Sequence, residues 1–257
     1  MKFKNLFATD VRRALLSWRF LLSSSGVSCI MLGAVSGLLR KSDFSSIWYF
    51  MYLSMGGSGT ASIILSIIPV FTFAISFAIE WEEKAVYFWI VRAGIIRYTI
   101  SKIVVSAISG FLTVVVGMIL FIVILMPWFP LFAISSTDYS YEILMGQGYV
   151  LLGMLLYIAH FGFTGALMAV CAMWISVYIP NRFVAAASPV VLQFTLTRFT
   201  SGRELPGYLT PILWFDGIYD VGSPFATLLI KLTTVLVLCS LMGIAATVQM
   251  KRRVSRA

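Results

Sequence analysis

The segment EWEEKAVYFWIVRAGIIRYTISK, residues 80–102, separates two long apolar runs of the chain. It carries three acids and four bases within a sequence that is otherwise poor in charge. Large apolar side chains are interleaved with these charges, which is typical of an amphipathic segment lying in water beside a membrane. We therefore predict that residues 80–102 form a docking surface for a soluble partner.

The composition indicates that the rest of the chain lies in a membrane. Hydrophobic residues make up 60% of the 257 residues, charged residues make up 11%, and the mean hydropathy is +0.96. A soluble protein has about 25% charged residues. Continuous apolar runs favour helices over barrel strands, so we predict an all-α, polytopic membrane protein. Its six transmembrane helices are expected at residues 20–39, 60–79, 103–125, 149–174, 183–199 and 225–249, the fifth being the shortest.

The basic residues predict the orientation, because Lys and Arg concentrate in cytoplasmic segments. With both termini in the cytoplasm, all but five of the 19 Lys and Arg residues fall on the cytoplasmic side, the exceptions being Arg40, Lys41, Arg198, Arg203 and Lys231. Termini on the same side of the membrane require an even number of spans, which supports six spans over five. We expect the chain to lie in the cell membrane. The net charge of +9 is thus a topology signal, and no basic, aromatic-lined groove exists that would receive nucleic acid.

Residues 1–19 read as a basic amphipathic helix. Phe3, Phe7 and Val11 recur at helical spacing, while Arg12 and Arg13 lie off that stripe. We expect this helix to lie in the inner leaflet and to turn into the first span. It either anchors the chain to membrane lipid or also braces a cytoplasmic partner.

Residues 200–224 form an unusual outer segment before the last span. Three prolines punctuate a run of bulky apolar residues that includes Leu209, Trp214 and Phe215. A solvated loop rarely carries such residues. The segment either dips into the outer leaflet as short helices, where these three residues would form an outer gate, or lies at the interface as an aromatic loop.

Several kinds of chemistry are absent from the sequence. It contains no GxxxxGK[ST] phosphate loop, no HExxH and no CxxC, so we expect no enzyme activity, cofactor or metal in this chain. His160 is the only histidine; in mid-span it either hydrogen-bonds a neighbouring helix or relays protons, and the first is favoured. A secondary transporter would need more ionisable groups at the midplane. A scaffold or sensor without transport stays open.

The order of these features resembles the permease subunits of type-2 ATP-binding-cassette (ABC-2) exporters over nearly the whole length. In that family a charged loop after the second span begins with acids, continues as a coupling helix and ends in a base. Family members often place Gly-Thr soon after the acids, where this chain has Lys84-Ala85-Val86. The resemblance assigns ATPase coupling to Glu80, Glu82, Glu83, Tyr87, Trp89, Arg92, Arg97 and Lys102.

The resemblance implies a mechanism and a set of partners. Residues 1–257 would form a single transmembrane permease domain, and two such subunits, identical or different, would enclose a substrate path. Two separate ATPase subunits would bind ATP and Mg and grip the coupling segments from below. The few charges in the spans suggest a hydrophobic or amphipathic cargo. Glycines such as Gly110 and Gly165 would allow close helix approach, either at moving contacts or in ordinary packing.

Overall fold

The computed structural model describes residues 3–39, 46–56, 60–133, 140–200 and 221–255. Within these ranges the chain is helical and contains no strand, which confirms the all-α class. The elements, in chain order, are α1 (Phe3–Leu15), α2 (Trp18–Val35), α3 (Ile47–Gly56), α4 (Thr60–Ser66), the π-helix η1 (Val70–Ala74), α5 (Ser76–Glu82), α6 (Val86–Ala93), α7 (Ile95–Leu125), α8 (Ser140–Gly146), α9 (Val150–Tyr178), α10 (Arg182–Thr200) and α12 (Pro224–Val254).

Four of the described helices, α2, α7, α9 and α12, are long and apolar enough to cross a membrane. They agree with four of the predicted spans, as expected of a multi-pass membrane protein. Helix α7 has 31 residues and is therefore about 46 Å long, which exceeds the ~30 Å hydrocarbon core of a bilayer. It must tilt or project from the membrane, and its first turns carry the charged end of the segment 80–102.

The predicted second span is not one straight helix. Residues Ile63–Ala74 and Ser76–Glu82 form two apolar pieces that meet at an angle of 45°. Pro69 directly precedes the π-helix η1. The two pieces meet at Ile75, directly after η1. A π-helix departs from the regular α-helical hydrogen-bond ladder, and such departures commonly bend a helix. The predicted fifth span corresponds to α10, in which the apolar stretch Arg182–Leu196 is shorter than a full span.

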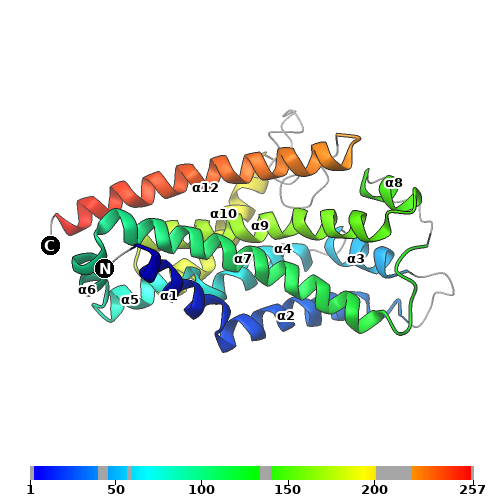
Figure 1. Ribbon diagram of the computed structural model, residues 1–257, viewed down its shortest axis with the longest axis horizontal. Coiled ribbons are helices and arrows are strands. Elements are labelled where there is room, and N and C mark those ends of the chain that lie inside the picture. The colour runs from blue at the N-terminus through cyan, green and yellow to red at the C-terminus, as the bar shows by residue number, and fades with distance from the viewer. Residues whose placement is uncertain (1–2, 40–45, 57–59, 134–139, 201–220, 256–257) are drawn as a thin grey trace.

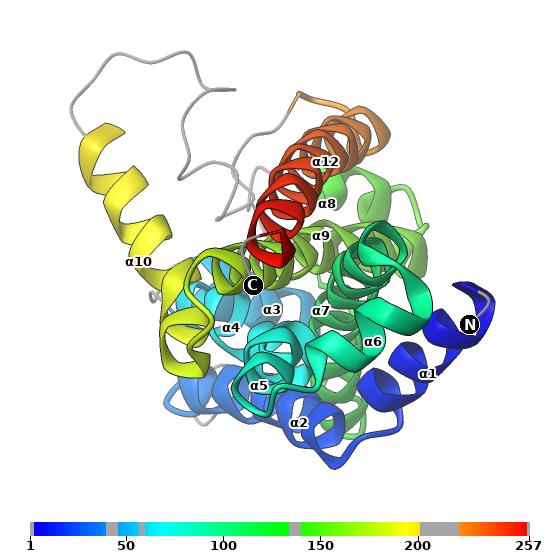
Figure 2. The same ribbon diagram turned by 90° about the vertical axis from the view of Figure 1, so that its left-hand side faces the viewer.

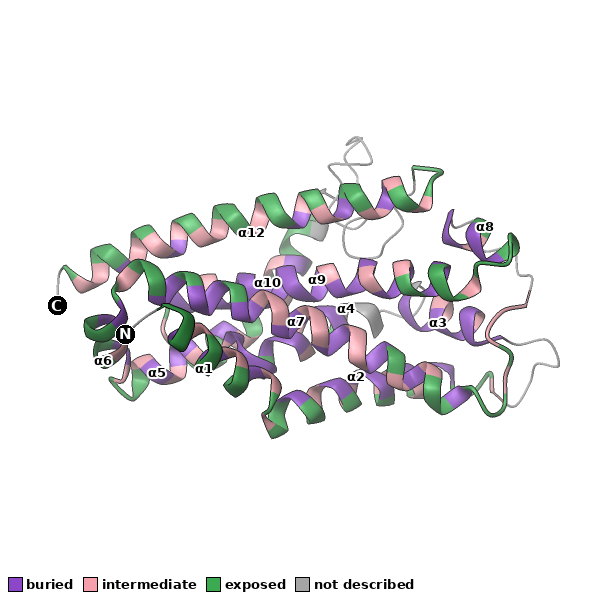
Figure 3. Ribbon diagram, viewed as in Figure 1, coloured by how far each residue is buried: buried purple, intermediate pink, exposed green. Residues whose placement is uncertain are grey.

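The long helices run side by side along one axis (Figure 1). The start of α1, the end of α12 and the short helix α6 lie at one end of this bundle, whereas α3 and α8 lie at the other. Helix α9 is the central element: 61% of its most apolar stretch is buried inside the protein, against 11% for α12. Figure 3 shows the same contrast along the two helices. The second half of α10 diverges from the other helices (Figure 2).

Glycines permit α7 to pack closely on its neighbours. A Cβ atom added at Gly110 would lie 2.6 Å from the carbonyl oxygen of Gly165 and 2.6 Å from Cβ of Ala169, both in α9. One added at Gly117 would lie 2.5 Å from Cβ of Val27 in α2. Small residues therefore set the separation of these helices, as they commonly do in membranes.

We predict that Gly110→Ala lowers the free energy of unfolding by about 1–3 kcal/mol, because the added methyl group meets backbone that cannot move away cheaply. The measurement is a denaturing-detergent titration followed by circular dichroism. The matched control is Gly26→Ala in α2, where an added Cβ meets nothing within 4 Å and helix propensity improves. Equal stabilities for the two variants would contradict the close packing of α7 on α9.

Candidate functional site

The segment 80–102 folds as the end of α5, a turn, helix α6 and the start of α7. Helix α6 buries Val86, Ile90 and Ala93, which share one helical face because they are four and three residues apart. The turn before α6 is closed by a 2.8 Å hydrogen bond from the Ala85 N–H to the Glu80 carbonyl oxygen. Gly94 ends α6 with a φ of +83°, a conformation that glycine adopts without strain.

The opposite face of α6 exposes large apolar side chains. Phe88 is 71% exposed, Val91 is 85% exposed and Tyr87 is 39% exposed. Their backbone is fixed, since the other face of the helix is packed against the bundle. An apolar patch held out from the protein in this way marks a contact surface.

Charged residues surround this patch. Of the eight residues predicted to couple to a partner, Glu82, Glu83, Tyr87, Arg92 and Arg97 are exposed and Trp89 is half-buried. Glu82 also faces the start of α10: one of its carboxylate oxygens lies 3.6 Å from Arg182 Nε, and the other accepts a 3.2 Å hydrogen bond from the Arg182 backbone N–H. An exposed pair of this kind contributes about 0–1 kcal/mol, so it orients the loop more than it stabilises the fold.

The remaining two predicted residues, Glu80 and Lys102, are buried. Lys102 Nζ lies 2.7 Å from Glu80 Oε1 and 3.1 Å from Asp10 Oδ1. An Arg13 guanidinium nitrogen lies 2.8 Å from the same Glu80 oxygen. The side chains of Lys102, Glu80 and Asp10 come from α7, α5 and α1 and are only 1–4% exposed. We call these three residues, together with the half-exposed Arg13 at their edge, the buried ionic cluster.

Every carboxylate oxygen in the buried ionic cluster has a donor. The Tyr98 hydroxyl donates a 2.6 Å hydrogen bond to Glu80 Oε2, and the Ser101 hydroxyl donates a 2.7 Å hydrogen bond to Asp10 Oδ2. The Lys102 ammonium lies 4.8 Å from the centre of the Phe73 ring, a favourable distance for a cation over an aromatic face. Two acids and two bases balance in charge, which buried charges require.

Glu80 and Lys102 are thus buried, whereas the sequence suggested that they are solvated. The physical reason is that α1 packs against the start of α7 and brings Asp10 as a second acid for Lys102. Asp10, Tyr98 and Ser101 were not among the predicted site residues. One signal was available for Asp10: it is the only acid before residue 43, and it lies four residues from both Leu6 and Ala14, the other buried residues of α1.

Two further predictions concern His160 and the outer gate. The hydroxyl of Tyr141 in α8 lies 3.0 Å from Nδ1 of His160 in α9, which agrees with the favoured interpretation of the lone histidine as a hydrogen-bonding partner. The predicted outer gate, Leu209, Trp214 and Phe215, lies outside the described residues.

Comparison of the chain with family models, curated proteins and solved structures finds no match.

Proposed function

We propose that this chain is the membrane-spanning permease subunit of an ATP-driven exporter of the ABC-2 type, and that α6 is the helix on which a separate ATPase subunit docks. ATP and Mg would be bound by that partner. The observation that carries the proposal is the exposure of Phe88 and Val91 on a rigid helix at the basic end of the bundle.

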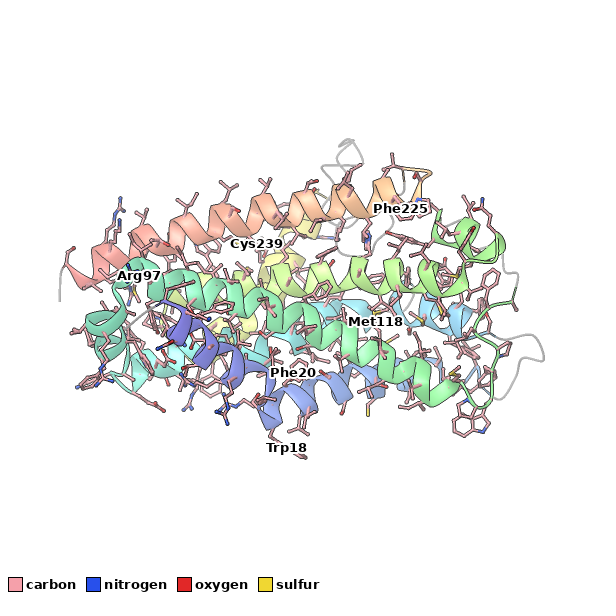
Figure 4. The ribbon with its side chains drawn as sticks, viewed as in Figure 1. Trp18, Phe20, Arg97, Met118, Phe225 and Cys239 are labelled. Atoms are coloured by element: carbon pink, nitrogen blue, oxygen red, sulfur yellow. The ribbon has the colours of Figure 1, made fainter. Side chains whose placement is uncertain are left out.

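Membrane lipid is a poor explanation for this exposure. Trp18 is 71% exposed and points away from the bundle part-way along it (Figure 4). Tryptophan concentrates at membrane interfaces, so Trp18 marks the depth of one membrane face. Helix α6 lies beyond that level, at the end of the bundle (Figure 1). Phe88 and Val91 would then project into water, where a soluble partner would cover them.

The chain connections of α6 suit the transmission of force. Helix α5 enters α6 through a turn of three residues, and Gly94 is the only residue between α6 and α7. The buried ionic cluster ties the ends of α5 and α7 to α1. A partner that displaces α6 would therefore move a bent span, a straight span and the N-terminal helix together.

The finer topology belongs to the same proposal. Six spans would be formed by the four long helices, the bent pair ending in α5, and α10. Both termini would be in the cytoplasm, because Lys251, Arg252 and Arg253 end α12 at the same end of the bundle as α6 (Figure 1). Helix α1 would lie at the inner interface. A second permease subunit would cover the outward apolar side chains of α10, such as Phe194 and Phe199, which are 65% and 69% exposed.

An ion-coupled secondary transporter is the alternative. The buried acids Asp10 and Glu80 could carry a coupling ion only if they were free to change partners. Both lie on the α6 side of the bundle and each already faces the Lys102 ammonium. Delivery of energy through α6 requires no such change, which favours the ATP-driven mechanism.

The test asks first whether a neighbouring gene encodes an ATPase without membrane spans, and then co-expresses that ATPase with this chain for purification and reconstitution. We expect a complex with two copies of each subunit, and ATP hydrolysis by the ATPase that changes when it is bound to this chain. A chain that purifies alone, binds no ATPase and moves solutes on an ion gradient without ATP would overturn the proposal in favour of the secondary transporter.

A further inference from the structure

A polar pocket lies where α1 meets α2. It adjoins the buried ionic cluster through Arg13, which belongs to both. Its volume is about 510 Å³, within the ~300–1,000 Å³ typical of ligand sites. The side chains of Arg13, Arg19 and Glu83 line it, together with the hydroxyl-bearing residues Ser17 and Thr72. Residues from α1, α2, η1 and α5, with the turn after α5, therefore form its walls.

The rim of this pocket lies at the level of a membrane interface. Trp18 and Leu16 line the pocket and are 71% and 78% exposed. Figure 4 shows Trp18 pointing away from the bundle at the corner between the two helices. An exposed indole beside an exposed leucine is typical of the boundary between headgroups and acyl chains. The pocket thus opens where phospholipid headgroups would be found.

The charges in the pocket suit a headgroup with a phosphate and an ammonium. Arg13 uses one nitrogen toward Glu80 at 2.8 Å, yet its side chain is 47% exposed, and a guanidinium has five N–H donors. Within the described residues neither Arg19 nor Glu83 forms an ion pair. Guanidinium groups bind phosphate through paired hydrogen bonds. A carboxylate in the same wall repels a second negative charge and accepts hydrogen bonds from a primary ammonium.

We propose that this pocket binds phosphatidylethanolamine from the leaflet nearest α6. Arg13 and Arg19 hold the phosphate, and Glu83 accepts from the ammonium group. A choline headgroup has no N–H to donate to Glu83, and a glycerol headgroup adds no positive charge there. Because Arg13 also contacts Glu80, the bound lipid connects the membrane interface to the buried ionic cluster. The site shares Glu83 with the charged residues around the apolar patch of α6, but it does not depend on the proposed function, because no ATPase subunit is needed for lipid to bind.

The experiment is native mass spectrometry of the purified, delipidated full-length chain titrated with phosphatidylethanolamine, phosphatidylcholine or phosphatidylglycerol. We expect phosphatidylethanolamine to bind most tightly. Arg19→Gln should weaken it about fivefold or more, from the ~1 kcal/mol that one basic residue contributes near a lipid surface. Glu83→Gln should remove the preference for ethanolamine over glycerol headgroups.

Matched controls remove the same charges from positions that do not line the pocket. Arg12→Gln and Glu82→Gln alter exposed residues of α1 and α5 and should leave both affinity and preference unchanged. A thermal melt of each variant reports its folding separately. Equal weakening by Arg12→Gln, or an unchanged preference in Glu83→Gln, would overturn the proposal. So would competition by soluble glycerophosphoethanolamine as strong as that by the lipid, since the site would then take a soluble phosphate ester.

Discussion

Lys102→Met is expected to lower the free energy of unfolding by about 3–5 kcal/mol, the cost of removing one partner from a buried ion pair. Methionine fills much of the volume of lysine, so the packing change is small. The loss arises because Asp10 and Glu80 each keep a buried negative charge, and Arg13 contacts only Glu80. The measurement is a denaturing-detergent titration of the purified chain followed by circular dichroism.

Two variants separate lost charge pairing from a general effect of removing lysine. Lys4→Met removes a base from the exposed side of α1 and should change stability by less than about 0.5 kcal/mol. The triple variant Asp10→Asn/Glu80→Gln/Lys102→Met has no uncompensated acid and should recover much of the loss, since neutral replacements for buried ion pairs are often tolerated. A Lys102→Met protein as stable as the Lys4→Met protein would contradict the buried ionic cluster.

The long spans were predictable because a membrane leaves a strong signal in sequence. Helices α7 and α12 follow continuous apolar runs, and a bilayer requires the length that such runs provide. The bend in the second span was not predicted, and it lies between Ala74 and Ser76, directly after the π-helix η1. Pro69 was visible in the sequence, but it lies inside the first straight piece, Ile63–Ala74, so it does not mark the position of the bend.

The buried ionic cluster was not predictable in the same way. Glu80 and Lys102 lie in a segment whose charges suggest water, and Asp10 is 92 residues from Lys102. Only the packing of α1 against α7 determines which charges meet. The outward face of α6 had a similar ambiguity: Val86 and Ile90 are as apolar as Phe88 and Val91, so periodicity placed apolar residues on both faces. The structure buries the first pair and exposes the second.

Truncation of Phe88 and Val91 should have the largest effect on partner binding. If α6 receives an ATPase subunit, Phe88→Ala/Val91→Ala should raise the dissociation constant of the complex at least about 30-fold, the ~2 kcal/mol expected of a contact hot spot. Stability of the isolated chain should change by less than about 0.5 kcal/mol, because both side chains are largely exposed. Binding is measured with the purified ATPase on the reconstituted chain, and stability by detergent titration.

Two further variants distinguish docking from the other uses of an apolar surface. Trp128→Ala removes a side chain that is 70% exposed, after α7 and thus at the far end of the bundle, and it should leave ATPase binding unchanged. Ile90→Ala truncates the packed face of α6 and should lower stability first, with binding reduced only as far as α6 loses its position. If Phe88 and Val91 instead touched lipid, the double variant would leave ATPase binding intact. That result would remove α6 as the docking helix, because Phe88 and Val91 are the most exposed large apolar side chains of the segment 80–102.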